Sequence, residues 1–337
     1  MASDFSKKDL FLPINAPIIE YSEYTKTNNT HWGQLKLIIE ELAFFVYFLS
    51  PQLSNGTVVY VGAASGQHIP ILARMFPTLS WELYDPSEFS ISEKDFPSGK
   101  IKIFTGTDGL FDKNKALMYA NRSDIIFISD IRRELTKQAD ARIRDEENEM
   151  KNDEIIIEDM NMQKEWIETI QPEIASLKFR LPWTLPENGA TSFNYFDGYI
   201  MLQPFAPVKS TESRLIPKKD SNGTYSYRDW DIKAYEGQMY RHNIEIRDRT
   251  FYKNPISRSD APFLKDELLN DYDSVATCFI LGEYLRKMNV TPVSEKVVAL
   301  YLKIVESINK FLPSGEEHVT LAKKRKSIIL KGKRPNV

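Results

Sequence analysis

Four charged side chains stand where the surrounding sequence is apolar. They are Lys36 within GQLKLII, Asp130 after IIFIS, Lys178 within ASLKF and Glu212 just before SRLI. A buried charge is costly unless it is paired, so charges in such surroundings indicate ion pairs or a reactive site. Taken singly, each is better explained as a surface residue or a salt-bridge partner. Gathered around a nucleoside pocket, two lysines and two carboxylates would suit transfer of a group to a hydroxyl.

A glycine pair marks a possible cofactor site. In VVYVGAASGQH, Gly62 and Gly66 flank a tight turn after a β-branched run, and Asp85 follows Gly62 by 23 residues. Such glycines let the backbone approach a ligand, and an acid near this spacing binds ribose hydroxyls in doubly wound folds. The loop lacks both G-x-G-x-x-G and G-K-[ST], so a nucleoside cofactor without a pyrophosphate fits best, and S-adenosylmethionine is the common one. A structural turn with a surface aspartate is the alternative.

The order of the elements that must position these groups predicts the fold. Seven short apolar runs predict strands over residues 57–62, 81–84, 101–104, 125–128, 175–179, 199–202 and 213–216. Helices are predicted over 33–49, 68–76, 113–120, the later part of 133–174, 259–287 and 294–311. Strands that alternate with helices indicate an α/β fold with a mostly parallel, doubly wound sheet. Such sheets bind ligands at the carboxyl ends of their strands.

Composition excludes several classes of protein. Of the 337 residues, 42% are hydrophobic and 12% aromatic, which is enough for a buried core. No apolar run approaches the roughly 20 residues that span a bilayer, and the first ten residues lack the apolar stretch of a signal peptide. One cysteine and four histidines exclude an internal disulfide and a Cys/His metal cluster. We therefore expect an intracellular, soluble protein that needs no metal.

Charge is segregated along the chain. The net charge is −3, yet the last 20 residues hold seven basic and no acidic side chains. The remaining residues carry 37 basic against 47 acidic side chains, a balance near −10. A basic tail on an acidic body is typical of contact with a polyanion, and a merely solvated tail is the alternative.

Several sequence blocks resemble the poxvirus-type cap-specific mRNA 2′-O-methyltransferases, which also act as the processivity subunit of poly(A) polymerase. The blocks keep the family's order over about residues 30 to 240, with no match in the last hundred residues. They are GQLKL at 33–37, TVVYVGAASGQHI at 57–69, FISDIR at 127–132, ASLKFR at 175–180, MLQPFAP at 201–207, STESRL at 210–215 and YEGQMY at 235–240. The resemblance implies a Rossmann-like methyltransferase fold with a mixed, mostly parallel seven-stranded sheet and helices on both faces.

The resemblance also assigns catalytic and cofactor roles. It makes Lys36, Asp130, Lys178 and Glu212 a catalytic tetrad, in which Lys178 steers or accepts the proton of a ribose 2′-OH. A ribose hydroxyl is a weak nucleophile, so the enzyme must supply alignment and a proton path. The residues implied to bind S-adenosylmethionine are Gln34, Tyr60, Gly62, Gly66, His68 and Asp85, with Asp108 a weaker match. Two positions depart from the family: Ser65 replaces a proline, and Ser87 replaces a basic residue.

A pocket for the methylated cap base is implied as well. The family holds the cationic N7-methylguanine between two aromatic rings, and acids accept its N1 and N2 hydrogens. Trp183 matches one ring, and Tyr21 is preferred to the nearby Tyr24 for the other. Glu236 matches the first acid, and Glu187 is the nearest residue for the second. Taken alone, Trp183 is better explained as an ordinary half-buried loop aromatic.

Two functions of different class follow from the resemblance. An enzyme would methylate the first transcribed nucleotide of capped mRNA, converting cap-0 to cap-1. A non-catalytic, RNA-binding subunit of a viral poly(A) polymerase is the alternative, and both functions can coexist. The complete tetrad favours the enzyme. Expected partners are capped mRNA and the catalytic subunit of the polymerase, with no membrane, in the virion and the host cytoplasm.

The expected organisation has three parts. Residues 1–30 form an arm that contributes to the cap pocket, residues 31–317 form the methyltransferase domain with flanking helices, and residues 318–337 form the basic tail.

Overall fold

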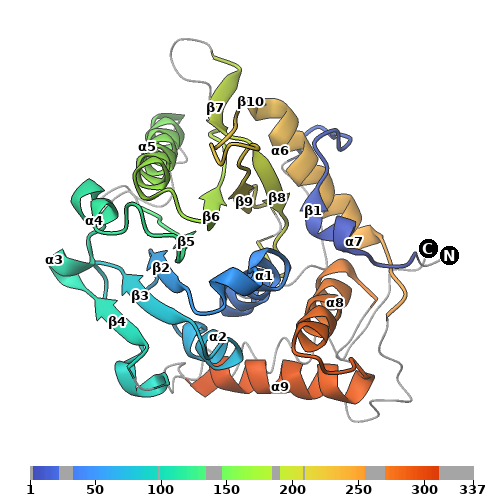
Figure 1. The fold of residues 1–337 in the computed structure, drawn as a ribbon. Helices are drawn as coiled ribbons and strands as arrows, with labels where there is room; N and C mark the ends of the chain where they lie inside the picture. The colour runs from blue at the N-terminus through green and yellow to red at the C-terminus, as the bar shows by residue number, and fades with distance from the viewer. Residues whose placement is uncertain are drawn as a thin grey trace.

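A mixed eight-stranded sheet with helices on both faces forms the centre of the protein (Figure 1). The computed structural model describes residues 3–22, 33–97, 99–133, 146–183, 190–207, 209–254 and 270–310. The strand order is β1-β8-β9-β6-β5-β2-β3-β4. The predicted class, an α/β fold with a mostly parallel sheet, is confirmed.

All seven strands predicted from apolar runs lie in this sheet. They are β2 (Thr57–Val61), β3 (Ser80–Tyr84), β4 (Ile101–Phe104), β5 (Ile125–Ser129), β6 (Ile174–Phe179), β8 (Gly198–Met201) and β9 (Ser213–Pro217). β4, β3, β2, β5 and β6 run parallel to one another, whereas β9 pairs antiparallel with both β6 and β8. β2 and β5 are buried along their whole length, because helices cover both faces of the parallel part.

The predicted strand number is one too low. Strand β1 (Phe11–Leu12), in the segment expected to be only a surface arm, pairs antiparallel with β8 at the edge of the sheet. A strand of two residues is too short to show an alternating pattern, so no sequence pattern predicts it. A separate two-stranded sheet of β7 (Ser192–Phe196) and β10 (Tyr227–Asp231) was also not predicted.

Helices cover the sheet in two layers (Figure 1). α3 (Gly106–Gly109), α4 (Lys113–Leu117) and α5 (Glu146–Ile170) lie on one side, and α1 (Gly33–Phe48), α2 (Ile69–Met75), α8 (Tyr272–Lys287) and α9 (Ser294–Lys310) on the other. α6 (Ile232–Arg241) continues through a π-helical turn (His242–Ile246) into α7 (Arg247–Arg249). Among the described residues, no helix is long and apolar enough to cross a membrane.

Two of the predicted helical regions are described only in part. The helix expected to start at residue 259 is described only from Tyr272, where the carboxylate of Asp271 accepts a hydrogen bond from the N–H of Ser274 and caps it. Residues 255–269 lie outside the described residues, as does the basic tail over 318–337. The loop predicted for the early part of 133–174 falls mostly on residues 134–145, which lie outside the described residues. The long helix predicted after it is α5, from Glu146 to Ile170.

The strand order reverses between β2 and β5. β3 and β4 lie on one side of β2, and β5 and β6 lie on the other. Gly62 and Asp130 follow β2 and β5 directly, and the N–H of Asp130 donates to the carbonyl of Val61 over 2.9 Å. Ligands of open α/β sheets bind in the crevice at such a reversal, so the two groups singled out in the sequence lie at the expected place.

Candidate active site

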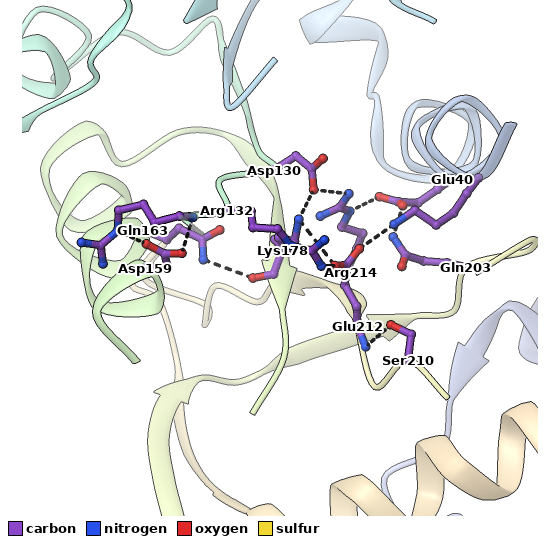
Figure 2. A network of polar contacts seen from close by, with 12 residues as sticks. Glu40, Asp130, Arg132, Asp159, Gln163, Lys178, Gln203, Ser210, Glu212 and Arg214 are labelled. Carbon is purple, nitrogen blue, oxygen red and sulfur yellow. Dashed lines mark hydrogen bonds and ion pairs between the residues drawn. The ribbon is translucent and has the colours of Figure 1, made fainter. Parts of the chain in front are cut away.

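Four elements bring the four predicted charged residues together. Lys36 lies on α1, Asp130 follows β5, Lys178 lies on β6, and Glu212 precedes β9. Lys36 Nζ donates to Glu212 Oε1 over 2.5 Å. Lys178 Nζ donates to Asp130 Oδ1 over 2.9 Å and lies 3.5 Å from Glu212 Oε2. The tetrad is therefore one continuous cluster, most of it visible in Figure 2.

A fifth charged residue, Arg214 of β9, forms an ion pair with the cluster. It pairs in register with Lys178 across β6 and β9, so the two side chains lie on the same face of the sheet. Arg214 Nη2 donates to Asp130 Oδ1 over 2.8 Å, and its Nε donates to Glu40 of α1 (Figure 2). Gln203 donates to the other oxygen of Glu40.

Sequence reasoning missed Arg214 and Glu40. Each is only 1% exposed, which is unusual for a charged side chain. A signal was available, because Arg214 interrupts the strand SRLI and Glu40 interrupts the apolar helix LIIEELAFF in the same way that the tetrad residues interrupt their own elements.

The electrostatics of the cluster keep its carboxylates ionised. Burial opposes ionisation of Asp130, but Arg214 and Lys178 outweigh it and hold the pKa of Asp130 below its ordinary value. Burial also opposes ionisation of Glu212, and Lys178 and Lys36 outweigh it, so its pKa lies well below the ordinary value. For Glu40 burial wins over Arg214 and Lys36, and its pKa rises to about 7. Lys178 therefore faces two carboxylates that are ionised at neutral pH.

The glycine loop packs tightly against the same crevice. Gly62 and Gly66 have positive φ values of 78° and 76°. A Cβ atom on Gly62 would lie 2.7 Å from the backbone carbon of Asp130, so only glycine fits this approach. The carboxylate of Asp85 accepts hydrogen bonds from the N–H groups of Ala64 (3.1 Å) and Ser87 (2.8 Å). Since a carboxylate has about four acceptor directions, Asp85 can hold the loop and still accept from ribose hydroxyls.

Three other predicted cofactor residues meet behind the loop. The hydroxyl of Tyr60 donates to the Glu41 carboxylate over 2.5 Å. The same carboxylate oxygen lies 3.1 Å from His68 Nε2. His68 Nδ1 lies 3.0 Å from the side-chain oxygen of Gln34. Glu41, which the sequence analysis did not single out, therefore joins Gln34, Tyr60 and His68 in one cluster, of which all but Gln34 are buried.

The weaker cofactor prediction, Asp108, lies on the exposed side of α3. Its neighbour Gly109 packs so closely on Asp85 that a Cβ atom there would lie 2.1 Å from the Asp85 carbonyl oxygen. Asp108 is thus on the element that adjoins Asp85, although no contact between the two side chains is formed.

The two predicted aromatic residues lie side by side. The ring centroids of Tyr21 and Trp183 are 6.3 Å apart and their planes make an angle of 46°. Trp183 is 38% exposed and Tyr21 is 42% exposed. The backbone N–H of Trp183 donates to Asp153 Oδ2 over 2.8 Å. Asp153 is a buried acid of α5 that the sequence analysis did not single out. Tyr24 and Glu187 lie outside the described residues.

Glu236 lies half-buried on α6. Burial raises its pKa, the Lys233 ammonium opposes the shift, and the Asp153 carboxylate adds to it. Among the described residues no group of three or more histidine, cysteine or acidic side chains could hold a metal ion.

Comparison with known proteins identifies the family. The poly A polymerase regulatory subunit family matches residues 13–310. The chain belongs to this family. The match extends well beyond the predicted span of about 30 to 240 and includes α8 and α9, so the expectation of no match in the last hundred residues was wrong. Neither helix contains a short motif that the sequence analysis singled out.

Individual relatives agree with the family match. The cap-specific mRNA (nucleoside-2′-O-)-methyltransferase of Myxoma virus (strain Lausanne) is 28% identical over 243 residues, which cover 69% of this chain and 67% of the relative. The enzyme of the same name from Fowlpox virus (strain NVSL) is 27% identical over 308 residues, covering 81% and 91%. The structure of bluetongue virus VP4 overlaps 69% of this chain and 38% of its own with a TM-score of 0.38 and 14% identity, too slight a likeness to carry an argument.

Proposed function

We propose that the protein methylates the ribose 2′-OH of the first transcribed nucleotide of N7-methylguanosine-capped mRNA, with S-adenosylmethionine as methyl donor. The observation that carries the proposal is the cluster of Lys36, Asp130, Lys178 and Glu212 beside the Gly62–Gly66 loop. The names of the viral relatives support it.

The tetrad can align the ribose hydroxyl and provide a path for the proton that such a transfer releases. The 2′-oxygen forms a bond to the methyl carbon as the carbon–sulfur bond breaks, and the hydroxyl proton must leave. Lys178, held by Asp130 and Glu212, steers the hydroxyl or takes its proton, while Lys36 fixes Glu212 from the far side. Neither carboxylate is free to move, so the cluster contributes mainly alignment and a fixed field.

The cofactor residues fit a nucleoside with a sulfonium side chain. The bound donor supplies an already activated methyl group. Gly62 and Gly66 would let the backbone approach the bound nucleoside closely. Asp85 would accept hydrogen bonds from its ribose hydroxyls, using the acceptor directions that the N–H groups of Ala64 and Ser87 leave free. The Gln34, Tyr60 and His68 cluster would support the loop from behind.

Tyr21 and Trp183 suit the cationic cap base. A base stacked between two rings needs ring planes about 7 Å apart, twice the ordinary stacking contact. The ring centroids are 6.3 Å apart and the planes make an angle of 46°, so the rings would have to turn parallel and separate slightly to hold a planar cation. Glu236 is half-buried on α6, the helix whose Tyr240 ring lies 5.0 Å from that of Tyr21, and it would accept the hydrogens of N1 and N2. The family description supports a second role as partner of a poly(A) polymerase catalytic subunit.

Methyl transfer from labelled S-adenosylmethionine tests the proposal directly. Short RNA with an N7-methylguanosine cap is compared with the same RNA uncapped, and nuclease digestion locates the label on ribose or base. We expect label on the ribose of the first nucleotide of the capped RNA alone. Label on a base, or equal transfer to uncapped RNA, would contradict the proposed function.

A further inference from the structure

The connection from β8 to β9 carries Glu212 to the tetrad. It comprises residues 202–212, all of them described except residue 208, and most of it is buried. Buried backbone carbonyl groups need hydrogen-bond donors, and a segment that is neither strand nor helix must find them elsewhere. Three carbonyls of the β8–β9 connection accept from side chains of α6, the π-helical turn and α7: Thr211 from Tyr235 over 2.6 Å, Ser210 from Asn243 over 2.8 Å, and Ala206 from Arg247 over 3.1 Å. One continuous helical segment therefore holds the backbone that leads to Glu212.

Asn243 and Arg247 act as one unit within this segment. Oδ1 of Asn243 accepts from Nη1 of Arg247 over 2.8 Å, while Nδ2 of Asn243 donates to the Ser210 carbonyl. Arg247 also makes a bidentate ion pair with Asp273 of α8, with bonds of 2.9 and 2.8 Å. Asn243 is 2% exposed and Arg247 is 1% exposed, so water cannot replace a bond that either side chain loses. The position of the Ser210 carbonyl is thus fixed by a network anchored on α8.

The π-helical turn that contains Asn243 supports a functional interpretation. The turn comprises His242–Ile246 and separates α6 from α7. Turns of this type are rare, and they occur frequently at functional sites. The hydrogen bond from Asn243 to the β8–β9 connection links this turn to the tetrad.

Only one residue separates Ser210 from Glu212. The N–H of Glu212 donates to Oγ of Ser210 over 3.1 Å, which ties the two residues together (Figure 2). Two residues of extended chain span about 7 Å, so a shift of the Ser210 backbone would reach the Glu212 carboxylate almost unchanged. That carboxylate lies 3.5 Å from Lys178 Nζ. Catalysis by alignment is sensitive to displacements of about 1 Å, which can lower a rate by about 100-fold.

We propose that Asn243 and Arg247 are positioning residues, which hold the β8–β9 connection so that the Glu212 carboxylate lies against Lys178. The inference rests on the proposed function for the reaction in which this alignment matters. Both residues act through the backbone of the connection and not through contact with either substrate. Their loss should therefore lower the rate of the chemical step more than the binding of cofactor or RNA.

Asn243→Asp and Asn243→Ala test the assignment, with Glu245→Gln as the matched control. Asn243→Asp keeps the size of the side chain and the acceptor for Arg247 but removes the donor to Ser210. Asn243→Ala removes both bonds and adds no charge. Glu245 lies in the same π-helical turn, and its carboxylate pairs with Arg241 of α6 at 2.9 Å.

Steady-state methyl transfer gives kcat and the KM values for S-adenosylmethionine and for capped RNA. Thermal unfolding shows that each variant is folded at the assay temperature. We expect kcat to fall by about 10- to 100-fold in both Asn243 variants, with both KM values within about threefold of wild type. Glu245→Gln should match wild type in all three constants.

A folded Asn243→Ala with kcat within about twofold of wild type would overturn the assignment. A rise of both KM values that accounts for the whole loss of activity would overturn it too, because the residue would then support binding in general. If Asn243→Asp does not fold because of its buried charge, Asn243→Ala decides alone.

Hydrogen exchange separates this inference from the proposed function, since it requires no activity. The amides of residues 209–213 should exchange at least about tenfold faster in Asn243→Ala than in wild type or Glu245→Gln. Unchanged exchange would overturn the inference even if the wild-type protein methylates capped RNA. A wild-type protein without methyl transfer would instead overturn the proposed function, and exchange would still show whether Asn243 holds the connection.

Discussion

Replacing the buried Arg214 by methionine tests whether the tetrad depends on the ion pairs beneath it. Methionine has a similar length and keeps the core filled, but it removes the donors to Asp130 and Glu40. Removal of one partner from a buried ion pair costs about 3–5 kcal/mol, because the remaining charge stays buried. With a urea slope near 3 kcal/mol/M for a chain of this size, the unfolding midpoint should fall by about 1–2 M.

The stability difference between Arg214→Met and wild type should depend on pH in a defined direction. Arg214 is the strongest of the cations that lower the pKa of Asp130, so that pKa must rise in Arg214→Met. In wild type, ionised Asp130 contributes stability above its ordinary pKa of 3.8, and this contribution is lost as the pH falls through the lower native value. The deficit of the variant should therefore be full at neutral pH and shrink toward pH 3. The acidic limb of its methyl-transfer profile should move to higher pH.

Two further variants complete the test. Arg214→Lys keeps the charge but reaches only one of the two carboxylates, so its loss of stability should be smaller. Adding Glu40→Gln to Arg214→Met removes the carboxylate left without its cation and should restore about 1–3 kcal/mol. A midpoint for Arg214→Met within about 0.5 kcal/mol of wild type, or an unmoved acidic limb, would refute the reasoning.

The remaining predictions concern the reaction, the cap and RNA. Lys178→Ala should abolish methyl transfer while cofactor and capped-RNA binding stay within a few-fold, and substantial residual activity would remove Lys178 from the mechanism. Trp183→Ala should weaken binding of N7-methylated cap far more than of unmethylated cap, whereas equal losses would mean that Trp183 only packs. Deletion of residues 319–337 removes seven basic side chains and should lower RNA affinity and its salt slope without changing the cap preference. An unchanged slope would assign this segment to another partner.

Local patterns were sufficient to predict the central sheet. The runs that became β2 and β5 are β-branched and buried on both faces, so their identity as strands does not depend on distant partners. β1 could not be predicted because its two residues are a strand only through pairing with Ile200 and Met201, far along the chain. β7 and β10 could not be predicted for a related reason, since the segments SFNYF and YRDWD form a sheet only with each other.

The site shows the same division between local and distant information. The tetrad could be found because each member interrupts a short, recognisable block. The pairing of Arg214 with Glu40 joins residues 174 positions apart, and no periodicity links them.

Helix α1 connects the two halves of the site. The helix is apolar nearly all round, which is typical of a buried helix, yet it holds four polar residues. Lys36 and Glu40, four positions apart, share one face and contact Glu212 and Arg214. Gln34 and Glu41, two turns apart, share another face and contact His68. One rigid helix therefore supports both the acceptor cluster and the cofactor loop, so a shift of α1 would disturb both sites together.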